Sequence, residues 1–253
     1  MRIALISDIH GNMDALESVL ADLDTRIDAA AGDQIWCLGD IIGYGPDPVA
    51  CVDTVARRCK WALMGNHDFG VLYEPTNFNK AAEEAAYWTR RQFEQAGVSH
   101  WEFLGKLRVR VVEGPFLCVH GSPRRPINEY LFPDDQPRKL HDVFSRIEHF
   151  CLVGHTHVPG VFTEDGFYGP ADMESATWTF DLGEKVIVNP GSVGQPRDLD
   201  PRASYAVIEM ADANTARSVC FHRVEYPVQK VVDKIHAIEA LNDWLGDRLL
   251  EGR

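Results

Sequence analysis

Short apolar runs alternate with amphipathic segments in the first third of the chain, and this alternation limits the possible folds more than any other feature. The runs at 3–6, 34–38 and 61–64 are too short for a helix, and each is followed within two residues by Asp or Asn. Between them, over 13–23 and 49–55, apolar residues recur about every three positions, as they do on one face of a helix. This order of strands and helices predicts a parallel sheet with right-handed crossovers.

The pattern changes after a helical stretch at 79–96. Short apolar runs then flank turn residues, which is typical of antiparallel hairpins. The expected pairs are 109–112 with 116–119, 161–162 with 167–168, 177–180 with 185–188 and 204–210 with 218–224, and one helix is expected over 231–249. We therefore expect an α/β (α+β) fold with two mixed sheets in a single domain over 1–253, with a helical insertion at about 71–104 and a hairpin region at about 160–188.

The charge of the chain excludes several classes of partner. Asp and Glu number 38 against 25 Lys and Arg, for a formal net charge of −13, which repels nucleic-acid backbones and anionic lipid. No apolar run approaches the roughly 18 residues of a membrane-spanning helix. The first strand also meets a charge at Asp8, too early for a signal peptide. We expect a cytoplasmic protein with no membrane partner and no non-specific binding to nucleic acid; the oligomeric state cannot be read from the sequence.

Side chains that bind metals follow five of the apolar runs. Because ligand sites in α/β sheets form at the carboxyl ends of strands, we expect these side chains to meet. Carboxylate, amide and imidazole ligands suit divalent manganese, iron, cobalt, nickel or zinc. Their number exceeds one four-ligand site, and two metals that share a bridging carboxylate would account for it. The five motifs are Asp8-Ile9-His10, Gly39-Asp40, Gly65-Asn66-His67-Asp68, His120-Gly121 and Gly154-His155-Thr156-His157.

These five motifs, in this order, resemble those of the calcineurin-like metallophosphoesterases. The stretch at 189–197, Asn-Pro-Gly-Ser-Val-Gly-Gln-Pro-Arg, further resembles the small bacterial phosphodiesterase branch. The resemblance implies a four-layer α-β-β-α sandwich and two divalent transition-metal ions (Mn, Fe, Ni, Co or Zn), without choosing among them. It implies one metal on Asp8, His10 and His157, a second on Asn66, His120 and His155, and Asp40 as the bridge between them.

The same resemblance implies a dinuclear metal-dependent phosphoesterase. The specific expectation is a phosphodiesterase that hydrolyses a small nucleotide or other phosphodiester by attack of a metal-bridging hydroxide. His67 would bind no metal but would face the phosphate as a general acid or charge stabiliser. The expected partner is a small phosphorylated substrate, which an acidic protein can hold because metals invert the local field.

The motifs also bear on three alternative functions. A phosphomonoesterase or dinucleoside polyphosphatase stays open. A protein Ser/Thr phosphatase is disfavoured, because those enzymes carry Asp-Arg-Gly after the second motif and end the third in Glu, where this chain has Gly43-Tyr44-Gly45 and Asp68. A non-catalytic scaffold of the same fold has an impaired site, whereas His67 is present here. The departures also leave open what orients His67.

In protein Ser/Thr phosphatases the arginine of Asp-Arg-Gly binds the phosphate. Here, arginines near the motif loops are candidates for that role. Arg124, Arg125 and Arg197 are in such places, and Arg197 is favoured by its loop. Tyr44 is predicted to stack on a base or an aryl leaving group. The competing interpretations are solvated arginines and an ordinary Gly/Pro turn around Tyr44.

Overall fold

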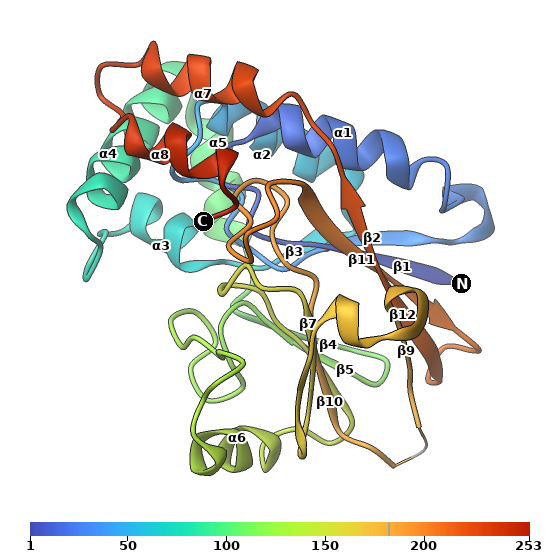
Figure 1. The fold of residues 1–253 in the computed structure, drawn as a ribbon. Helices are drawn as coiled ribbons and strands as arrows, with labels where there is room; N and C mark the ends of the chain where they lie inside the picture. Colours follow the sequence, from blue (N-terminus) through green and yellow to red (C-terminus); the bar gives the residue numbers. More distant parts are fainter. Residues whose placement is uncertain (182) are drawn as a thin grey trace.

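Two six-stranded sheets pack face to face in the computed structural model, which describes residues 1–181 and 183–253 (Figure 1). In the first sheet the order is β3-β2-β1-β11-β12-β9, with β1, β2 and β3 parallel and the other three strands joined antiparallel. Its strands are β1 (Arg2–Ile6), β2 (Gln34–Cys37), β3 (Trp61–Ala62), β9 (Thr177–Thr179), β11 (Ala203–Met210) and β12 (Ala216–Val224).

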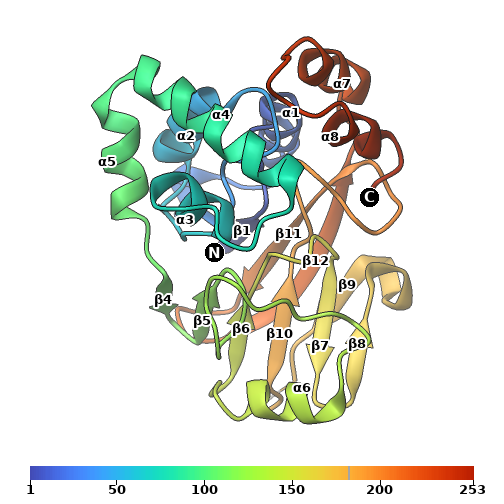
Figure 2. The same cartoon turned by 90° about the vertical axis from the view of Figure 1, so that its left-hand side faces the viewer.

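The second sheet has the order β4-β5-β6-β10-β7-β8, and Figure 2 shows these strands side by side. Its central strands β5, β6 and β10 are parallel, and the outer strands pair antiparallel. Both sheets are therefore mixed, as the sequence predicts. The strands are β4 (Arg110–Glu113), β5 (Phe116–Val119), β6 (Phe150–Leu152), β7 (Gly160–Thr163), β8 (Gly166–Tyr168) and β10 (Val186–Asn189).

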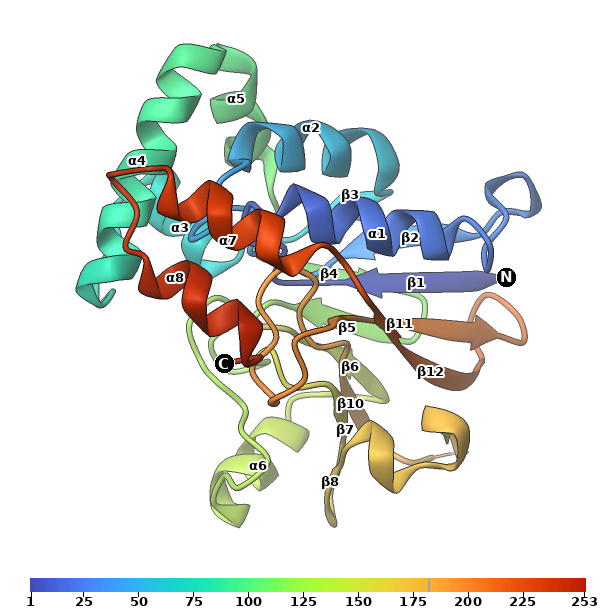
Figure 3. The same ribbon diagram turned by 45° about the horizontal axis from the view of Figure 1, so that its top comes forward.

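Helices cover the outer faces of both sheets (Figure 3). They are α1 (Met13–Leu23), α2 (Pro48–Arg58), α3 (Asn66–Leu72), α4 (Lys80–Ala96), α5 (Val98–Lys106), α6 (Pro137–Phe144), α7 (Val228–His236) and α8 (Trp244–Asp247), with short 3-10 helices at Ala29–Ala31, Pro170–Asp172, Glu174–Ala176 and Arg248–Leu250. No helix in the described part of the chain is both long enough and apolar enough to cross a membrane.

The alternation of side chains along β1 explains the order of the layers. Ala4 and Ile6 pack in the cluster formed with α1 and α2, whereas Ile3 and Leu5 point into the cluster between the two sheets. On the far side, Val143 of α6 packs on the outer face of the second sheet. The structure thus confirms the α/β four-layer α-β-β-α sandwich.

The predicted hairpin of 177–180 with 185–188 is wrong. β9 pairs with β12 in the first sheet, whereas β10 lies between β6 and β7 in the second. The chain changes sheets between these two runs, and short apolar runs carry no information about which strand they will pair with. Leu182, in the predicted turn, is outside the described residues.

The predicted single helix over 231–249 is also wrong. α7 ends at His236, and the side chain of Asn242 accepts the Trp244 N–H at 3.1 Å where α8 begins. Val231 and Leu245, on either side of the break, still pack in one buried cluster. The apolar residues that pack in this cluster therefore keep a spacing of three and four positions across two separate helices.

Candidate metal centre

The loops at the carboxyl ends of the strands bring the predicted ligands together at one edge of the sandwich. Each predicted ligand lies shortly after the end of a strand or at the start of a helix. Asp8 and His10 follow β1, Asp40 follows β2, Asn66 begins α3, His120 follows β5, and His155 and His157 follow β6. Apart from Asn66, which is partly exposed, all of these residues are buried.

Several ligand candidates have a left-handed backbone, which L-residues rarely adopt. This conformation costs roughly 1–2 kcal/mol per residue, and such strain is concentrated at functional sites. The loops thus accept backbone strain, at a cost in local stability, and this strain sets the direction in which their side chains point. The residues and their φ angles are Asp8 (54°), His10 (50°), Asp40 (52°), His155 (70°) and His157 (62°).

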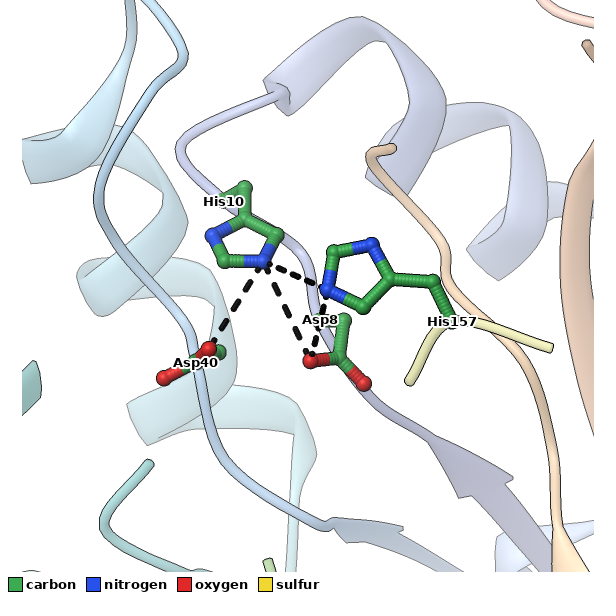
Figure 4. A group of neighbouring side chains, drawn as sticks. All are labelled: Asp8, His10, Asp40 and His157. Carbon is green, nitrogen blue, oxygen red and sulfur yellow. Dashed lines mark hydrogen bonds and ion pairs between the residues drawn. The ribbon is translucent and has the colours of Figure 1, made fainter. Parts of the chain in front are cut away.

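Four of these side chains form a first group that could hold a metal ion (Figure 4). His10 Nε2 lies 3.7 Å from Asp40 Oδ2 and 3.9 Å from Asp8 Oδ1. His157 Nε2 lies 3.2 Å from Asp8 Oδ1 and 3.1 Å from His10 Nε2. The donor atoms thus converge on one point in the manner of a coordination site.

Asp40, His120 and His155 form a second group. His120 Nε2 lies 3.3 Å from Asp40 Oδ2. The Nε2 atoms of His120 and His155 and Oδ1 of Asn66 are buried with no hydrogen-bond partner among residues 1–181 and 183–253. Unpartnered buried polar atoms cost about 1–3 kcal/mol each, so the two imidazoles grouped with the Asp40 carboxylate fit a cation. Asp40 belongs to both groups.

Backbone carbonyls fix the orientation of three of the histidines. The Nδ1 atom of His10 contacts the Ile42 carbonyl at 3.2 Å, that of His120 the Leu38 carbonyl at 2.9 Å, and that of His157 the Gln195 carbonyl at 2.5 Å. When Nδ1–H donates to a carbonyl, the lone pair of Nε2 is left free to bind a metal. In each case it is Nε2 that faces Asp8 or Asp40.

Burial and charge set the protonation of the site. Burial lowers the pKa of His155 to about 3 and that of His10 well below its ordinary value, so both rings are neutral near pH 7. Burial also opposes the charged form of His120, but the adjacent Asp40 outweighs it and raises the pKa of His120 to about 9. Despite burial, the neighbouring imidazoles hold the pKa of Asp40 well below its usual range. Metals bind ionised carboxylates and neutral imidazoles, so a metal bound at His120 would displace the proton from its ring.

His67 is positioned by packing rather than by a hydrogen bond to its ring. Its ring centroid lies 4.3 Å from that of Tyr44 and 4.6 Å from that of Phe78, and its Nδ1 is unpartnered among the described residues. Its backbone N–H donates to Asp40 Oδ1 at 2.8 Å. At Gly43, which has φ of 92°, a Cβ would lie 2.5 Å from His67 Nδ1, so only glycine fits beside this ring.

Asp68 has a role that sequence reasoning missed. Its Oδ2 accepts the N–H groups of Asp40 at 2.8 Å and Gly65 at 2.9 Å, and its Oδ1 accepts that of Ile41 at 3.0 Å. Asp68 thus ties the second motif loop to the third. The signal in the sequence was an acidic residue in the first turn of a helix that begins with a ligand, where side chains cap backbone N–H groups.

The three candidate arginines have different surroundings. Arg124 is paired with Glu129 at 3.1 Å and Asp142 at 3.4 Å. Arg197 forms no ion pair with any described carboxylate; it donates to Gln195 Oε1 at 2.7 Å, and its guanidinium carbon lies 5.9 Å from the Tyr44 ring centroid. Arg125 is exposed and is also unpaired within the described structure.

Tyr44 is 8% exposed, and its ring packs against His10 at 4.8 Å in addition to His67. Little of this ring is therefore left to stack on a substrate, and its contacts are those of a support for the two histidines.

A cleft of about 670 Å³ lies beside the second group. Asn66, His67 and His155 form part of its wall, together with residues from α3, the stretch leading into α4, and the loop after β5. The remaining lining residues are Tyr44, Phe69, Glu74, Thr76, Asn77, Phe78, Asn79, Ala82, Val109, Arg125, Pro126, Ile127, Asn128 and Tyr130.

Comparison with known protein families gives a match over residues 1–213 to the calcineurin-like phosphoesterase superfamily domain. The chain belongs to this superfamily. The resemblance carried by the five motifs is thereby confirmed, and hydrolysis of phosphoesters is the chemistry of the family.

Individual relatives agree with the family match. The crystal structure of a metallophosphoesterase from Sphaerobacter thermophilus is 39% identical, covers 100% of both chains and superposes with a TM-score of 0.84. An uncharacterised protein of Methanocaldococcus jannaschii is 36% identical over 99% of this chain and 98% of its own. A symmetrical bis(5'-nucleosyl)-tetraphosphatase of Erwinia tasmaniensis is 31% identical, but over only 35% of this chain and 37% of its own.

Proposed function

We propose that this protein is a dinuclear metal-dependent phosphodiesterase that hydrolyses a small nucleotide or another small phosphodiester in the cytoplasm. The observation that best supports the proposal is the position of Asp40, which belongs to both groups of potential metal ligands. A carboxylate shared in this way is what a two-metal site requires.

The residues present fit two divalent cations. Asp8, His10 and His157 would hold one, and Asn66, His120 and His155 the other, with Asp40 between them. When bound, two such cations neutralise the charge of a phosphate and acidify a water molecule. Nitrogen and oxygen donors of this kind accept Mn, Fe, Ni, Co or Zn, so we assign no single metal.

His67 would assist the departure of the leaving group. Its backbone is fixed to Asp40, and its ring is held between Tyr44 and Phe78 at the end of the cleft. Burial lowers the pKa of His67 to about 4, so the imidazole would first be protonated beside the negative charge of a bound phosphate; it would then stabilise the charge that develops on the leaving oxygen and donate that proton to it.

Arg197 would bind a phosphate oxygen. Its buried Nε has no hydrogen-bond partner in the described parts of the chain, and no carboxylate neutralises it. An arginine without an acidic partner beside a candidate metal centre is available for a charge-assisted hydrogen bond to an anion. Arg124, which is paired with two acids, is not.

A dinucleoside polyphosphatase is a second candidate, favoured by the partial match to the tetraphosphatase of Erwinia tasmaniensis. The test is a substrate panel with the purified protein loaded in turn with Mn, Ni, Co, Zn and Fe. We expect metal-dependent hydrolysis of bis-p-nitrophenyl phosphate to exceed that of p-nitrophenyl phosphate. Preference for diadenosine tetraphosphate over simple diesters would favour the second candidate, and activity unchanged after exhaustive chelation would exclude both.

A further inference from the structure

The cleft beside the second group of ligands has no role in the chemistry described so far. We propose that it is the binding site for a planar heterocyclic ring, such as a nucleobase, carried by one ester group of the substrate. This inference rests on the proposed phosphodiesterase function and assigns the residues that select the substrate.

The position of the cleft connects it to the reacting phosphate. Asn66, His67 and His155 form part of its wall and also belong to the proposed catalytic centre. A group that fills the cleft would therefore be attached to a phosphate held at the metals. Its volume of about 670 Å³ is within the range of roughly 300–1,000 Å³ that is usual for sites binding small organic molecules.

Apolar side chains line the cleft on two sides. Phe69 and Phe78 come from the helical side, and Pro126, Ile127 and Tyr130 come from the loop after β5. Tyr130 stacks on His155 with a centroid distance of 3.7 Å and on Phe132 with a centroid distance of 5.3 Å, which holds its ring in place while 38% of the residue stays exposed. Aromatic surfaces bind flat rings without requiring a particular base, because every base has a π-face.

The polar groups of the cleft are mostly uncharged. Asn77 and Asn128 are exposed lining residues whose side chains make no hydrogen bond to any other residue that the structure describes. An amide offers both donors and an acceptor, which is what the edge of a nucleobase needs. Asn79 is not available in this way, because its side chain caps α4 by accepting the Ala82 N–H at 3.0 Å.

The charges in the cleft argue against a chain of phosphates as its occupant. Its lining includes one cation at neutral pH, Arg125, and one exposed acid, Glu74. A polyphosphate would need several cations and would be repelled by the acid. Arg197, which also has no ion pair in the described structure, is not part of this lining. The geometry thus separates a place for the ring from a place for the phosphate.

Binding to the manganese-loaded protein tests the assignment. Adenosine 5'-monophosphate and ribose 5-phosphate share the sugar phosphate and differ in the base, so their affinities measured by calorimetry isolate the ring. We expect adenosine 5'-monophosphate to bind at least about tenfold more tightly, the scale of one base on an aromatic surface. Asn128→Trp, at the exposed rim, should remove most of this preference by filling the cleft.

Asn214→Trp is the matched control, because Asn214 is an exposed asparagine in the turn between β11 and β12, outside the cleft. It should retain the preference. Tyr130→Ala and Tyr130→Phe form a second pair that does not depend on the folding of Asn128→Trp. The alanine should lose the preference and the phenylalanine should keep it.

Equal affinities for the two ligands, or a preference that survives both Asn128→Trp and Tyr130→Ala, would overturn the assignment. If bis-p-nitrophenyl phosphate were still hydrolysed, only the cleft assignment would fail. If the base preference were present but no diester were hydrolysed with any metal, the cleft would stand and the proposed function would fail.

Discussion

The Asp68 carboxylate accepts the backbone N–H of Asp40 at 2.8 Å, although the two residues are 28 positions apart. This contact fixes the residue that is shared by the two groups of potential ligands. The same carboxylate also accepts N–H groups of Gly65 and Ile41, so it holds the second and third motif loops together. In this chain, the aspartate at the end of the third motif supports the site through the backbone.

We predict that Asp68→Asn weakens metal binding by about 10–100-fold, the usual cost of removing a group that supports metal ligands. An amide has one acceptor oxygen in place of two, so its NH2 group would face either the Ile41 N–H or the N–H groups of Asp40 and Gly65, and those contacts would be lost. Asp172→Asn is the control, because Asp172 accepts the Gly169 N–H at 2.9 Å in a similar turn away from the site. Metal content measured by mass spectrometry in buffers of graded free metal would decide, and an unchanged affinity in Asp68→Asn would contradict the prediction.

Asn66 and His67 are neighbours for which we predict opposite effects on metal and rate. Asn66→Ala should weaken binding at one metal site and leave the other largely filled, because Asn66 Oδ1 is a buried acceptor with no hydrogen-bond partner among the described residues. His67→Ala should keep both ions but lower kcat by about 10²–10⁴-fold, the scale of a lost general acid.

The loss in His67→Ala should be smaller for diesters with good leaving groups such as p-nitrophenol, because these need little protonation. Metal analysis measures the effect on metal content. The values of kcat for pairs of diesters with good and poor leaving groups measure the effect on rate. An emptied metal site in His67→Ala would make His67 a ligand, and an unchanged rate would exclude the acid role.

Arg197→Ala should lower kcat/KM for a diester by about tenfold or more, the scale of one charge-assisted hydrogen bond. Arg124→Ala is the matched control, since the Arg124 guanidinium is already paired with Glu129 and Asp142. It should leave kcat/KM within about twofold of the unmodified protein. Equal effects of the two substitutions in steady-state kinetics would contradict phosphate binding by Arg197 and favour its interpretation as a solvated surface arginine.

The contact between α1 and α7 should make stability depend on pH. Asp14 lies 2.6 Å from both Lys230 and Lys234; burial alone would raise the pKa of Asp14, but the lysines lower it below its ordinary 3.8. Because the folded pKa is the lower one, this stabilisation is present above about pH 4 and is lost as the pH falls through the folded value.

Asp14→Asn should therefore lower the free energy of unfolding by about 1–2 kcal/mol at pH 7, and the difference should shrink below pH 4. Asp24→Asn breaks a pair with Arg58 in which both side chains are exposed, and should cost less than about 1 kcal/mol. Urea unfolding of the three proteins at several pH values measures both quantities. A difference at pH 7 that persisted unchanged at low pH would contradict the assignment to Asp14.

The sequence predicted the parts of this molecule that depend on local pattern. The alternation of side chains in β1 and the helical period of α1 follow from which face each side chain must bury, and Asp40 lies three residues after the end of β2. Pairing between distant strands does not follow from local pattern, so the partner of β9 was missed. The difference between Arg124 and Arg197 was equally invisible, because it depends on acids such as Asp142 that only the fold brings near.

The left-handed backbone at Asp8, His10, Asp40, His155 and His157 has a consequence for protein engineering. Glycine adopts this conformation without the steric cost that a Cβ imposes, and stability is often gained by removing strain at functional positions. A selection for thermal tolerance alone places no value on the metal ligands at these five positions. Glycine there would remove the backbone strain together with the metal ligand and with hydrogen bonds such as that from the His67 N–H to Asp40 Oδ1, so any such selection needs metal binding as a second criterion.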